Sequence, residues 1–362
     1  MTAFEAVRAR FPVLKERAYL NAGTFGPLSR ATSEAIATEV VLETERGRSG
    51  AEIFDRLRAR RQRLRELLAA QIGAPAEAVA LTSSTTSGCA IVVNGLRLEP
   101  EDEVVTTDVE HFGLIGPLVA SGARIRVARL SGRPAADAFD AIRAEVTPRT
   151  RLLALSHVSW KTGQAIPCAE LRAETGVPTL VDGAQSAGAI PVDATAVDYY
   201  TVSAQKWLCG PDATGALYVR DPDSLALTAP SYFSQADYDL EDPSFVPKEG
   251  AARFDTGTVP APTLAGLEVA LDEPPDWRFE HAAAVAARCR EALTGAGFEV
   301  VTEPGQSTLV SFAVEGDAAE AAKRCGEAGV VVRDLPGTGW LRASCGYWTS
   351  DEDVERLIDA LR

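Results

Sequence analysis

Lysine is scarce in this chain of 362 residues. Of its 36 basic residues, 31 are arginines and five are lysines, namely Lys15, Lys161, Lys206, Lys248 and Lys323. Arginine keeps its proton in proteins, whereas a lysine of lowered pKa can lose it and attack a carbonyl group. Lys206, which follows an apolar run with strand character, is therefore a candidate for covalent chemistry. A surface lysine at the junction of a strand and a loop is the commoner case.

Histidine and paired cysteine are also scarce. The three histidines form no H-x-x-H pair, and the six cysteines are scattered with no C-x-x-C motif. Metal sites and disulfide frameworks usually need such spacing. We therefore expect no metal site and no disulfide framework.

No run of 18 apolar residues is present, and the opening MTAFEAVRARFPVLKER is charged throughout. Both features predict that there is no membrane span and no signal peptide, and therefore a cytoplasmic location. The formal net charge of −15 argues against a general nucleic-acid binder, because phosphates would meet no broad positive surface. A small anion held by backbone amides remains compatible with this charge.

Seven short apolar runs alternate with stretches of crossover length. They are 78–83, 103–108, 124–130, 151–158, 178–183, 199–204 and 216–219. Such runs are typical of strands buried on both faces of a mainly parallel sheet. We therefore predict an α/β fold with a large domain over residues 17–255 and a seven-stranded sheet, preceded by helical sequence at 31–72.

A smaller C-terminal α/β domain is predicted for residues 256–362, with residues 1–16 packing on it. Its expected helices are 278–296 and 317–328, and its expected strands are 308–314, 330–335 and 340–345. Thr349 and Glu352 have capping-box spacing before a last amphipathic helix. The Pro-, Asp- and Tyr-rich segment 222–262 predicts a long irregular loop, which is usually functional.

Polar side chains follow several of the predicted strands. The turn TSSTTSGC (82–89) follows the first, His111 the second, Asp182 the fifth, and Ser203 with Lys206 the sixth. Ligands of parallel α/β sheets bind at the carboxyl ends of the strands, so we expect these groups to lie together. Asp182 could instead cap a helix and His111 could simply pack, but their joint occurrence favours one site.

Pyridoxal 5′-phosphate needs this combination of groups. Its phosphate needs amides and hydroxyls, which a Ser/Thr-rich turn before a helix supplies. Its ring nitrogen needs a carboxylate, and its aldehyde needs a lysine. The sequence therefore predicts this cofactor, with Asp182 at the ring nitrogen and Lys206 at the aldehyde.

The chain also resembles the fold-type I pyridoxal-phosphate transferases of the aminotransferase class V family. The resemblance rests on YLNAGTFGPLS (19–29), LSHVSWKTGQAIP (155–167), LVDGAQSAGAIPVD (180–193), VDYYTVSAQKWLCGPDATGALYV (197–219) and LRASCGYWTSDEDVERLIDAL (341–361). That group contains cysteine desulfurases, isopenicillin N epimerases, kynureninases and cystine/cysteine C–S lyases. It implies an enzyme that forms a homodimer with shared active sites.

The resemblance implies a role for each residue of the site. Lys206 would attach the cofactor and move the proton at the substrate Cα, His111 would stack on the ring and assist that transfer, and Asp182 would pair with the ring nitrogen. Gln185 would contact the 3′ oxygen of the cofactor. Its phosphate would be bound by Thr85, Thr86 and Ser203, together with Thr258 of the partner subunit. Arg342 would bind the substrate α-carboxylate.

Departures from the desulfurase pattern favour a C–S lyase. Desulfurases carry a nucleophilic cysteine in the loop that is VVRDLPGTGWLR (331–342) here, and this loop has none. Cys345 lies beyond Arg342, where we expect a structural role.

Trp160 stands where desulfurases usually have Asn. A Trp followed by T-G-Q resembles the C–S lyases, and there it would contact the substrate. Packing of this side chain is the simpler alternative. Gln205 replaces a histidine that many desulfurases carry.

We therefore expect a C–S lyase that catalyses β-elimination from L-cysteine, cystine or another S-substituted cysteine, giving pyruvate, ammonia and a thiol or persulfide. The enzymatic alternatives are a cysteine desulfurase, an epimerase and an aminotransferase on the same cofactor. A catalytically silent regulator or scaffold is the alternative from a different class. The sequence leaves the S-substituent, the fate of the sulfur and the pathway open.

Overall fold

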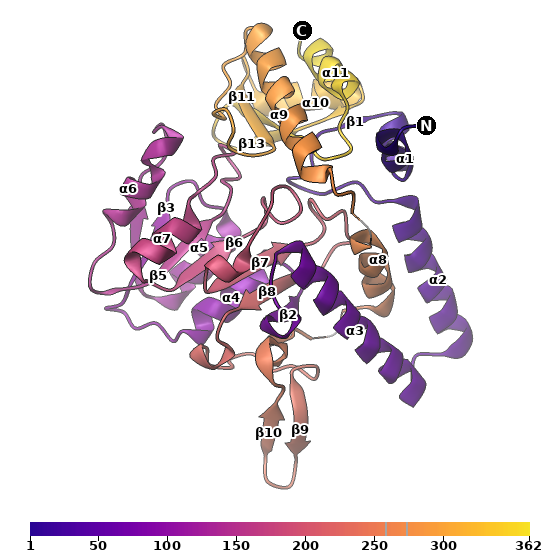
Figure 1. Cartoon of the computed structure of the whole chain (residues 1–362), viewed down its shortest axis with the longest axis vertical. Coiled ribbons are helices and arrows are strands. Elements are labelled where there is room, and N and C mark those ends of the chain that lie inside the picture. The colour runs from indigo at the N-terminus through magenta and orange to yellow at the C-terminus, as the bar shows by residue number, and fades with distance from the viewer. Residues whose placement is uncertain (258, 273) are drawn as a thin grey trace.

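The computed structural model describes residues 1–257, 259–272 and 274–362. A large α/β domain forms the middle of the molecule, a smaller one lies above it, and a hairpin projects from the opposite end (Figure 1). Both chain ends lie beside the smaller domain (Figure 1). No helix in the described ranges is long and apolar enough to cross a membrane.

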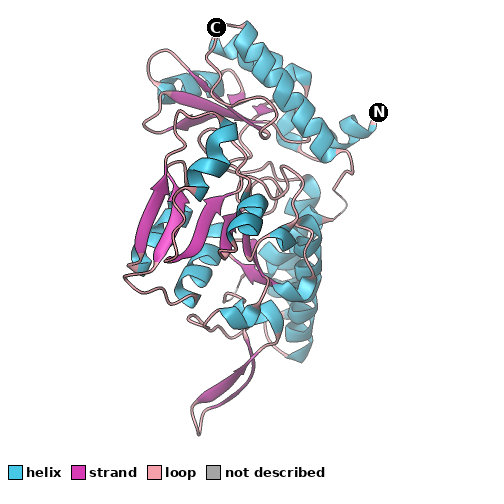
Figure 2. Ribbon diagram, turned by 60° about the vertical axis from the view of Figure 1, so that its left-hand side comes forward, coloured by secondary structure: helices cyan, strands magenta, loops and turns pink. Residues whose placement is uncertain are grey.

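A seven-stranded sheet forms the centre of the large domain (Figure 2). Its order is β2-β8-β7-β6-β5-β3-β4, and β8 alone in this sheet runs antiparallel to its neighbours. The strands are β2 (Val79–Thr82), β3 (Glu103–Thr107), β4 (Arg124–Ala128), β5 (Thr150–Ser156), β6 (Thr179–Asp182), β7 (Tyr199–Ser203) and β8 (Gly215–Val219). The predicted mainly parallel sheet is confirmed.

Helices cover both faces of this sheet because its strands are apolar on both faces. In β5, for example, Leu152 and Ala154 pack on one side, and Leu153 and Leu155 on the other. The first face carries α4 (Thr85–Gly95) and α5 (Phe112–Ser121). The second carries α3 (Ala51–Gln71), α6 (Ala138–Arg143), α7 (Cys168–Thr175) and α8 (Ala261–Leu271).

The predicted helical stretch at 31–72 forms two helices. α2 (Arg30–Arg46) ends at Gly47 and α3 begins after Gly50. Both glycines have positive φ, 79° and 103°, which a residue with a side chain adopts at a cost. The chain therefore reverses here without a steric penalty.

The smaller domain is an antiparallel sheet covered by helices. Its strand order is β11-β14-β13, and a separate parallel pair joins β1 to β12. The elements are β1 (Ala18–Tyr19), β11 (Leu309–Ala313), β12 (Val330–Val331), β13 (Arg333–Leu335), β14 (Trp340–Ser344), α9 (Arg278–Gly295), α10 (Ala318–Glu327) and α11 (Asp351–Leu361). The N-terminal helix α1 (Ala3–Ala9) packs on this domain, where Arg8 pairs with Asp353 at 2.5 Å.

The last helix has a different cap from the predicted one. Ser350 is the N-cap: its hydroxyl accepts from the Asp353 backbone N–H at 3.2 Å, and Asp353 Oδ2 accepts from the Ser350 N–H at 2.9 Å. The predicted pair of Thr349 and Glu352 is wrong, because Thr349 Oγ1 instead accepts from the N–H of Gly346.

The position of α8 bears on the predicted domain boundary. This helix follows residue 256, yet Leu264, Leu267 and Leu271 belong to the core of the large domain. It packs on α2 and α3. The division at residue 256 stays a proposal, and this packing favours a boundary after Leu271.

The predicted irregular segment contains a hairpin. β9 (Gln235–Asp239) and β10 (Ser244–Pro247) pair antiparallel and project from the body of the molecule (Figures 1 and 2). The prediction of a loop throughout 222–262 is therefore wrong for these strands. Their residues are largely exposed and lack the apolar alternation by which buried strands are recognised.

Candidate active site

Lys206 lies in the turn that follows β7, within electrostatic range of Asp182 and Arg342. Desolvation lowers the pKa of Lys206 to about 8; the charge of Arg342 adds to this shift and that of Asp182 opposes it. A larger neutral fraction at neutral pH makes this amine a better nucleophile than an ordinary lysine.

Asp182 is the last residue of β6 and is 3% exposed. Its Oδ1 accepts from the N–H of Ala184 at 2.9 Å. The next residue must be glycine, because a Cβ at Gly183 would collide with the ring of Tyr200 and the carbonyl of Thr201. The strand therefore ends on a buried carboxylate whose turn is closely packed.

The N-terminus of α4 lies against the end of β7. Ser84 caps the helix and accepts from the N–H of Ser87. The Thr85 N–H donates to Ser203 Oγ at 3.1 Å, and Ser203 Oγ donates to Thr85 Oγ1 at 3.2 Å. Thr86 follows and is exposed. Three of the predicted phosphate ligands thus gather at the positive end of a helix dipole.

His111 is the N-cap residue of α5. Its Nδ1 accepts from the N–H of Gly113 at 3.0 Å, which leaves the proton of a neutral ring on Nε2. The imidazole packs edge-on against Trp160, with ring centroids 5.3 Å apart. Desolvation, and then the charge of Lys206, lowers the pKa of His111, which favours the neutral ring.

Arg342 is a buried cation on β14, only 2% exposed. Nη1 donates to the carbonyl of Trp160 at 2.9 Å, Nη2 lies 3.5 Å from Thr24 Oγ1, and Nε has no hydrogen-bond partner in the described part of the chain. No carboxylate of the described residues lies within ion-pair distance of it. Burial, and the charge of Arg333 on the paired strand, lowers the pKa of Arg342 to about 10.

Trp160 and Gln185 are both held by the protein. Trp160 Nε1 donates to the carbonyl of Glu110 at 3.0 Å. Gln185 accepts from Trp207 Nε1 at 3.0 Å and donates to the carbonyl of Gly23 at 2.8 Å. Both polar atoms of the Gln185 side-chain amide therefore have protein partners. Its contact with the 3′ oxygen of the cofactor stays a prediction.

Cys345 lies in the core of the smaller domain and is fully buried. Its thiol faces Cys289, and that contact and burial raise its pKa well above the ordinary value. A buried thiol of raised pKa is a poor nucleophile. This position supports the expected structural role.

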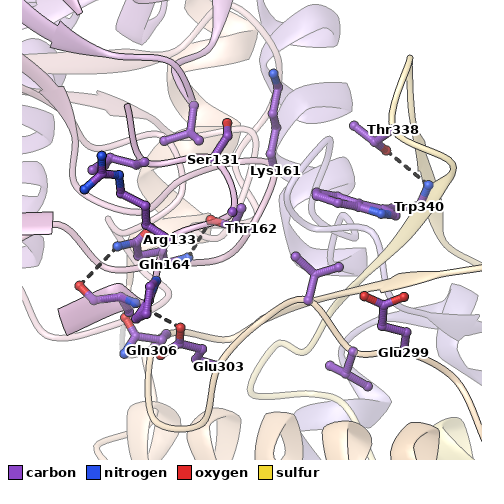
Figure 3. Close-up of a pocket in the computed structure, with 17 residues that line it drawn as sticks. Ser131, Arg133, Lys161, Thr162, Gln164, Glu299, Glu303, Gln306, Thr338 and Trp340 are labelled. Carbon is purple, nitrogen blue, oxygen red and sulfur yellow. Dashed lines mark hydrogen bonds between the residues drawn. The ribbon is translucent and has the colours of Figure 1, made fainter. Parts of the chain in front are cut away.

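A cavity of about 680 Å³ adjoins this group of residues. Figure 3 shows Lys161, Thr162 and Gln164, from the turn after β5, on one side of it and Glu299 and Trp340, from the smaller domain, on the other. Because side chains alternate along a strand, Trp340 and Arg342 face the same side of β14. The cavity therefore lies next to Trp340, two residues along β14 from the buried guanidinium of Arg342.

Two features of the site carry no clear sequence signal. Gly23 and Thr24 lie beside Arg342, and a Cβ at Gly23 would collide with its guanidinium. Glu110 is a buried carboxylate that the sequence places only beside His111. Gly23 in YLNAGTFGPLS could have suggested a close approach to another side chain. The burial of Glu110 depends on strands distant in sequence.

The structure thus brings together Lys206, Asp182, His111, Arg342 and Trp160, with Thr85, Thr86 and Ser203 at the adjoining helix N-terminus. Thr258 lies outside the described residues. The roles of these residues in binding cofactor or substrate stay predictions.

Comparison with known proteins identifies the family. The Aminotransferase class-V family model matches residues 42–357, and the chain belongs to that family of enzymes. The predicted family, fold and enzyme class are thereby confirmed.

Related enzymes are similar in sequence over nearly the whole chain. An isopenicillin N epimerase of Streptomyces clavuligerus is 30% identical over 99% of this chain and 97% of its own length. The cysteine desulfurase CsdA of Escherichia coli is 28% identical over 98% and 96%. The family therefore includes relatives of this chain with more than one chemistry.

Solved structures are similar over the same length. The cystine C–S lyase C-DES in complex with its reaction product cysteine persulfide has a TM-score of 0.90, 28% identity and coverage of 97% of this chain and 98% of its own. A C-DES mutant with glycine covalently linked to the pyridoxal-phosphate cofactor has a TM-score of 0.91 at 28% identity, covering 98% of both chains.

Proposed function

We propose that the protein binds pyridoxal 5′-phosphate and catalyses β-elimination from L-cysteine, cystine or another S-substituted cysteine. The products are pyruvate, ammonia and a thiol or persulfide. The observation that carries this proposal is the meeting of a lysine of lowered pKa, a buried carboxylate and a buried guanidinium without a carboxylate partner among the described residues.

The residues of the site fit this cofactor. Lys206 would hold its aldehyde carbon covalently, and Asp182 would keep a proton on its ring nitrogen. Thr85, Thr86 and Ser203 offer hydroxyls at the N-terminus of α4, where the helix dipole favours a phosphate. When bound, the cofactor stores the electrons left at the substrate Cα after proton removal.

Arg342 supports an amino-acid substrate. A buried guanidinium without a counter-ion is costly, and a bidentate carboxylate would compensate it. Its unpartnered Nε leaves donor capacity for such an anion. Arg342 would therefore orient the substrate by its α-carboxylate.

The chain's own groups account for the proton and bond changes. Lys206 Nζ would accept the Cα proton of the bound substrate. The Cβ–S bond then breaks, and its electron pair leaves on sulfur as a thiolate or persulfide. Water converts the remaining three-carbon fragment to pyruvate and ammonia. No protein thiol takes part.

A cysteine desulfurase is the less favoured alternative. It would need a nucleophilic thiol close to the substrate sulfur, yet the loop 331–342 contains no cysteine. All six cysteines are buried, and the pKa of Cys345 is raised. An elimination reaction requires none of them.

An epimerase is the second candidate, and a specific observation favours it: the relative that is 30% identical over 99% of this chain is an isopenicillin N epimerase. Removal and return of the Cα proton needs the same lysine, ring and carboxylate. It needs no leaving group at Cβ, so the products distinguish the two reactions.

We further propose that the protein acts as a homodimer with shared sites, in the cytoplasm. Large apolar side chains stand exposed in several places, including Phe112 (80%) at the start of α5, Val41 (53%) on α2 and Tyr232 (63%) before the β9–β10 hairpin. Exposed apolar groups in number usually mark an interaction surface. Sedimentation tests the dimer, and a fully active monomer would contradict it.

The function is tested with a panel of S-substituted cysteines. Pyruvate, ammonia and thiol are measured together, with alanine and loss of optical activity as the alternative readouts. Equimolar pyruvate and thiol are expected. Alanine would indicate a desulfurase, and racemised substrate with neither keto acid nor thiol would indicate the epimerase.

A further inference from the structure

Glu110 is a buried carboxylate in the connection between β3 and α5, directly before His111. It is 8% exposed. Buried carboxylates usually pair with a cation. Among the residues that the structure describes, no lysine, arginine or histidine forms an ion pair with this one.

Neutral donors hold the carboxylate instead. Oε1 accepts from Thr107 Oγ1 at 2.7 Å. Oε2 accepts from the backbone N–H of Ser156 at 3.0 Å and from its hydroxyl at 2.5 Å. Thr107 ends β3 and Ser156 ends β5, so the side chain joins the carboxyl ends of two neighbouring strands.

The backbone of the same residue supports the wall of the site. Its carbonyl accepts from Trp160 Nε1 at 3.0 Å, and Trp160 packs edge-on against His111. Ser159 Oγ adds a longer bond to the carbonyl of Val109, at 3.4 Å. The segment that carries His111 and the turn that carries Trp160 are thus joined mainly through Glu110.

The charged neighbour of Glu110 is Asp182 of β6. The buried thiols of Cys89 in α4 and Cys168 in α7 also lie within electrostatic range, and burial raises their pKa, so they are neutral. Burial raises the pKa of Glu110 to about 7; Asp182 adds to this shift, while the bonds from Ser156 and Thr107 oppose it. Ser156 is also the register partner of Asp182 in the β5–β6 pair, so Glu110 lies one strand away from that carboxylate.

We propose that Glu110 is a positioning residue of the active site, which fixes the His111–Trp160 wall and, through its negative charge beside Asp182, helps to keep the bound cofactor in its protonated form. This inference rests on the proposed function. A negative charge near a protonated nitrogen stabilises the protonated form. A purely structural carboxylate would have no such effect on the ring.

The test compares variants by the visible absorbance of the bound cofactor between about pH 6 and 10. Glu110→Gln keeps the shape of the side chain and removes its charge, so the protonated form should be lost at lower pH. We expect the midpoint to fall by about half a pH unit or more. Glu110→Asp keeps the charge, so its midpoint should lie closer to that of the wild type.

Glu103→Gln is the matched control. Glu103 is a buried carboxylate at the other end of β3, held by Thr147 and Arg149. Its loss should lower thermal stability without moving the absorbance midpoint. A wild-type midpoint in folded, cofactor-loaded Glu110→Gln protein would overturn the inference.

Ser156→Ala covers the case in which Glu110→Gln does not fold. It removes one donor from the carboxylate, so less of Glu110 is ionised and the midpoint should fall in the same direction by a smaller amount. An unchanged midpoint there would also overturn the inference. A wild-type protein without a cofactor absorbance band would overturn both the proposed function and this inference. A normal wild-type band, with variants whose absorbance midpoints equal that of the wild type, would overturn this inference alone.

Discussion

Arg342 Nη1 donates to the backbone carbonyl of Trp160 at 2.9 Å. This bond joins β14 of the smaller domain to the turn after β5 of the large domain. The two segments are 182 residues apart in sequence, yet they meet where His111, Lys206 and Asp182 also gather. The site therefore depends on the contact between the two domains as well as on the strand ends.

The first prediction concerns Lys206. Borohydride treatment of the purified protein should fix the cofactor mass to a peptide that contains Lys206, and Lys206→Ala should lose turnover, because no arginine can supply a neutral amine. Peptide mass spectrometry locates the label. Lys248→Ala serves as the control and should keep both properties. Label on any other lysine would refute the assignment.

The second prediction separates the binding role of Arg342 from a structural one. Arg342→Met should lower kcat/KM by about 100-fold or more, because the substrate carboxylate loses its charged partner. Its free energy of unfolding without substrate should change little, because a buried cation without a carboxylate partner is removed.

Arg65→Met is the contrasting variant. Arg65 donates to both carboxylate oxygens of Asp255, at 3.1 and 2.9 Å. Among the residues that the structure describes, its loss leaves Asp255 with Arg61 as its one ion-pair partner, and should cost about 3 kcal/mol or more of stability. Chemical unfolding measures both. An equal loss of stability in the two variants would show that Arg342 is a structural residue.

The third prediction is a pH dependence. The pKa of Lys206 is lowered to about 8, so the amine is protonated and unreactive below that pH and neutral above it. The rate at which cofactor-free protein takes up pyridoxal phosphate should rise with pH and level off above about 8 to 9, well below the ordinary range of lysine. Stopped-flow absorbance measures this rate.

Two variants should move that midpoint in opposite directions. Arg342 lowers the pKa of Lys206 and Asp182 raises it. Arg342→Met should therefore move the midpoint upward, and Asp182→Asn should move it downward. A midpoint near the ordinary lysine value in the wild type would show that Lys206 is not desolvated in solution.

The fourth prediction is that the S-substituent of a bound cysteine derivative enters the cavity next to Trp340, two residues from Arg342 along β14. Lys161 lines it, and its amino group lies 5.8 Å from the centre of the Trp160 ring. Lys161→Met should weaken inhibition by S-carboxymethylcysteine about two- to fivefold, the scale of a partly exposed ion pair, and leave S-propylcysteine unaffected. Equal changes for both inhibitors would argue against a charge effect.

Much of the fold could be predicted because its strands are apolar on both faces. The run 151–158 overlaps β5 in all but its first residue, and the end of 178–183 places Asp182 at the sheet edge. The sequence does not predict the hairpin β9–β10, because its residues are largely exposed and show no apolar alternation. The cap of α11 differs by one residue because Thr349 bonds Gly346, a choice made by tertiary contacts.

The site was predictable to the same extent. The polar residues that follow strands along the chain meet as the parallel topology requires. The sequence does not mark Glu110 as a residue of the site, because a carboxylate next to a histidine in sequence gives no sign of being buried. Its bond to Ser156 joins positions 46 residues apart, and only the folded chain brings them together.

The central claim is tested most directly by product analysis of Cys345→Ser beside the wild type with cystine as substrate. Cys345 is fully buried in the core of the smaller domain, so the variant should keep most of its turnover. Both proteins should form pyruvate and ammonia in equal amounts, with no persulfide on the protein. Alanine as the main product, or a fall in turnover of several orders of magnitude in Cys345→Ser with a persulfide on the wild-type protein, would contradict the account.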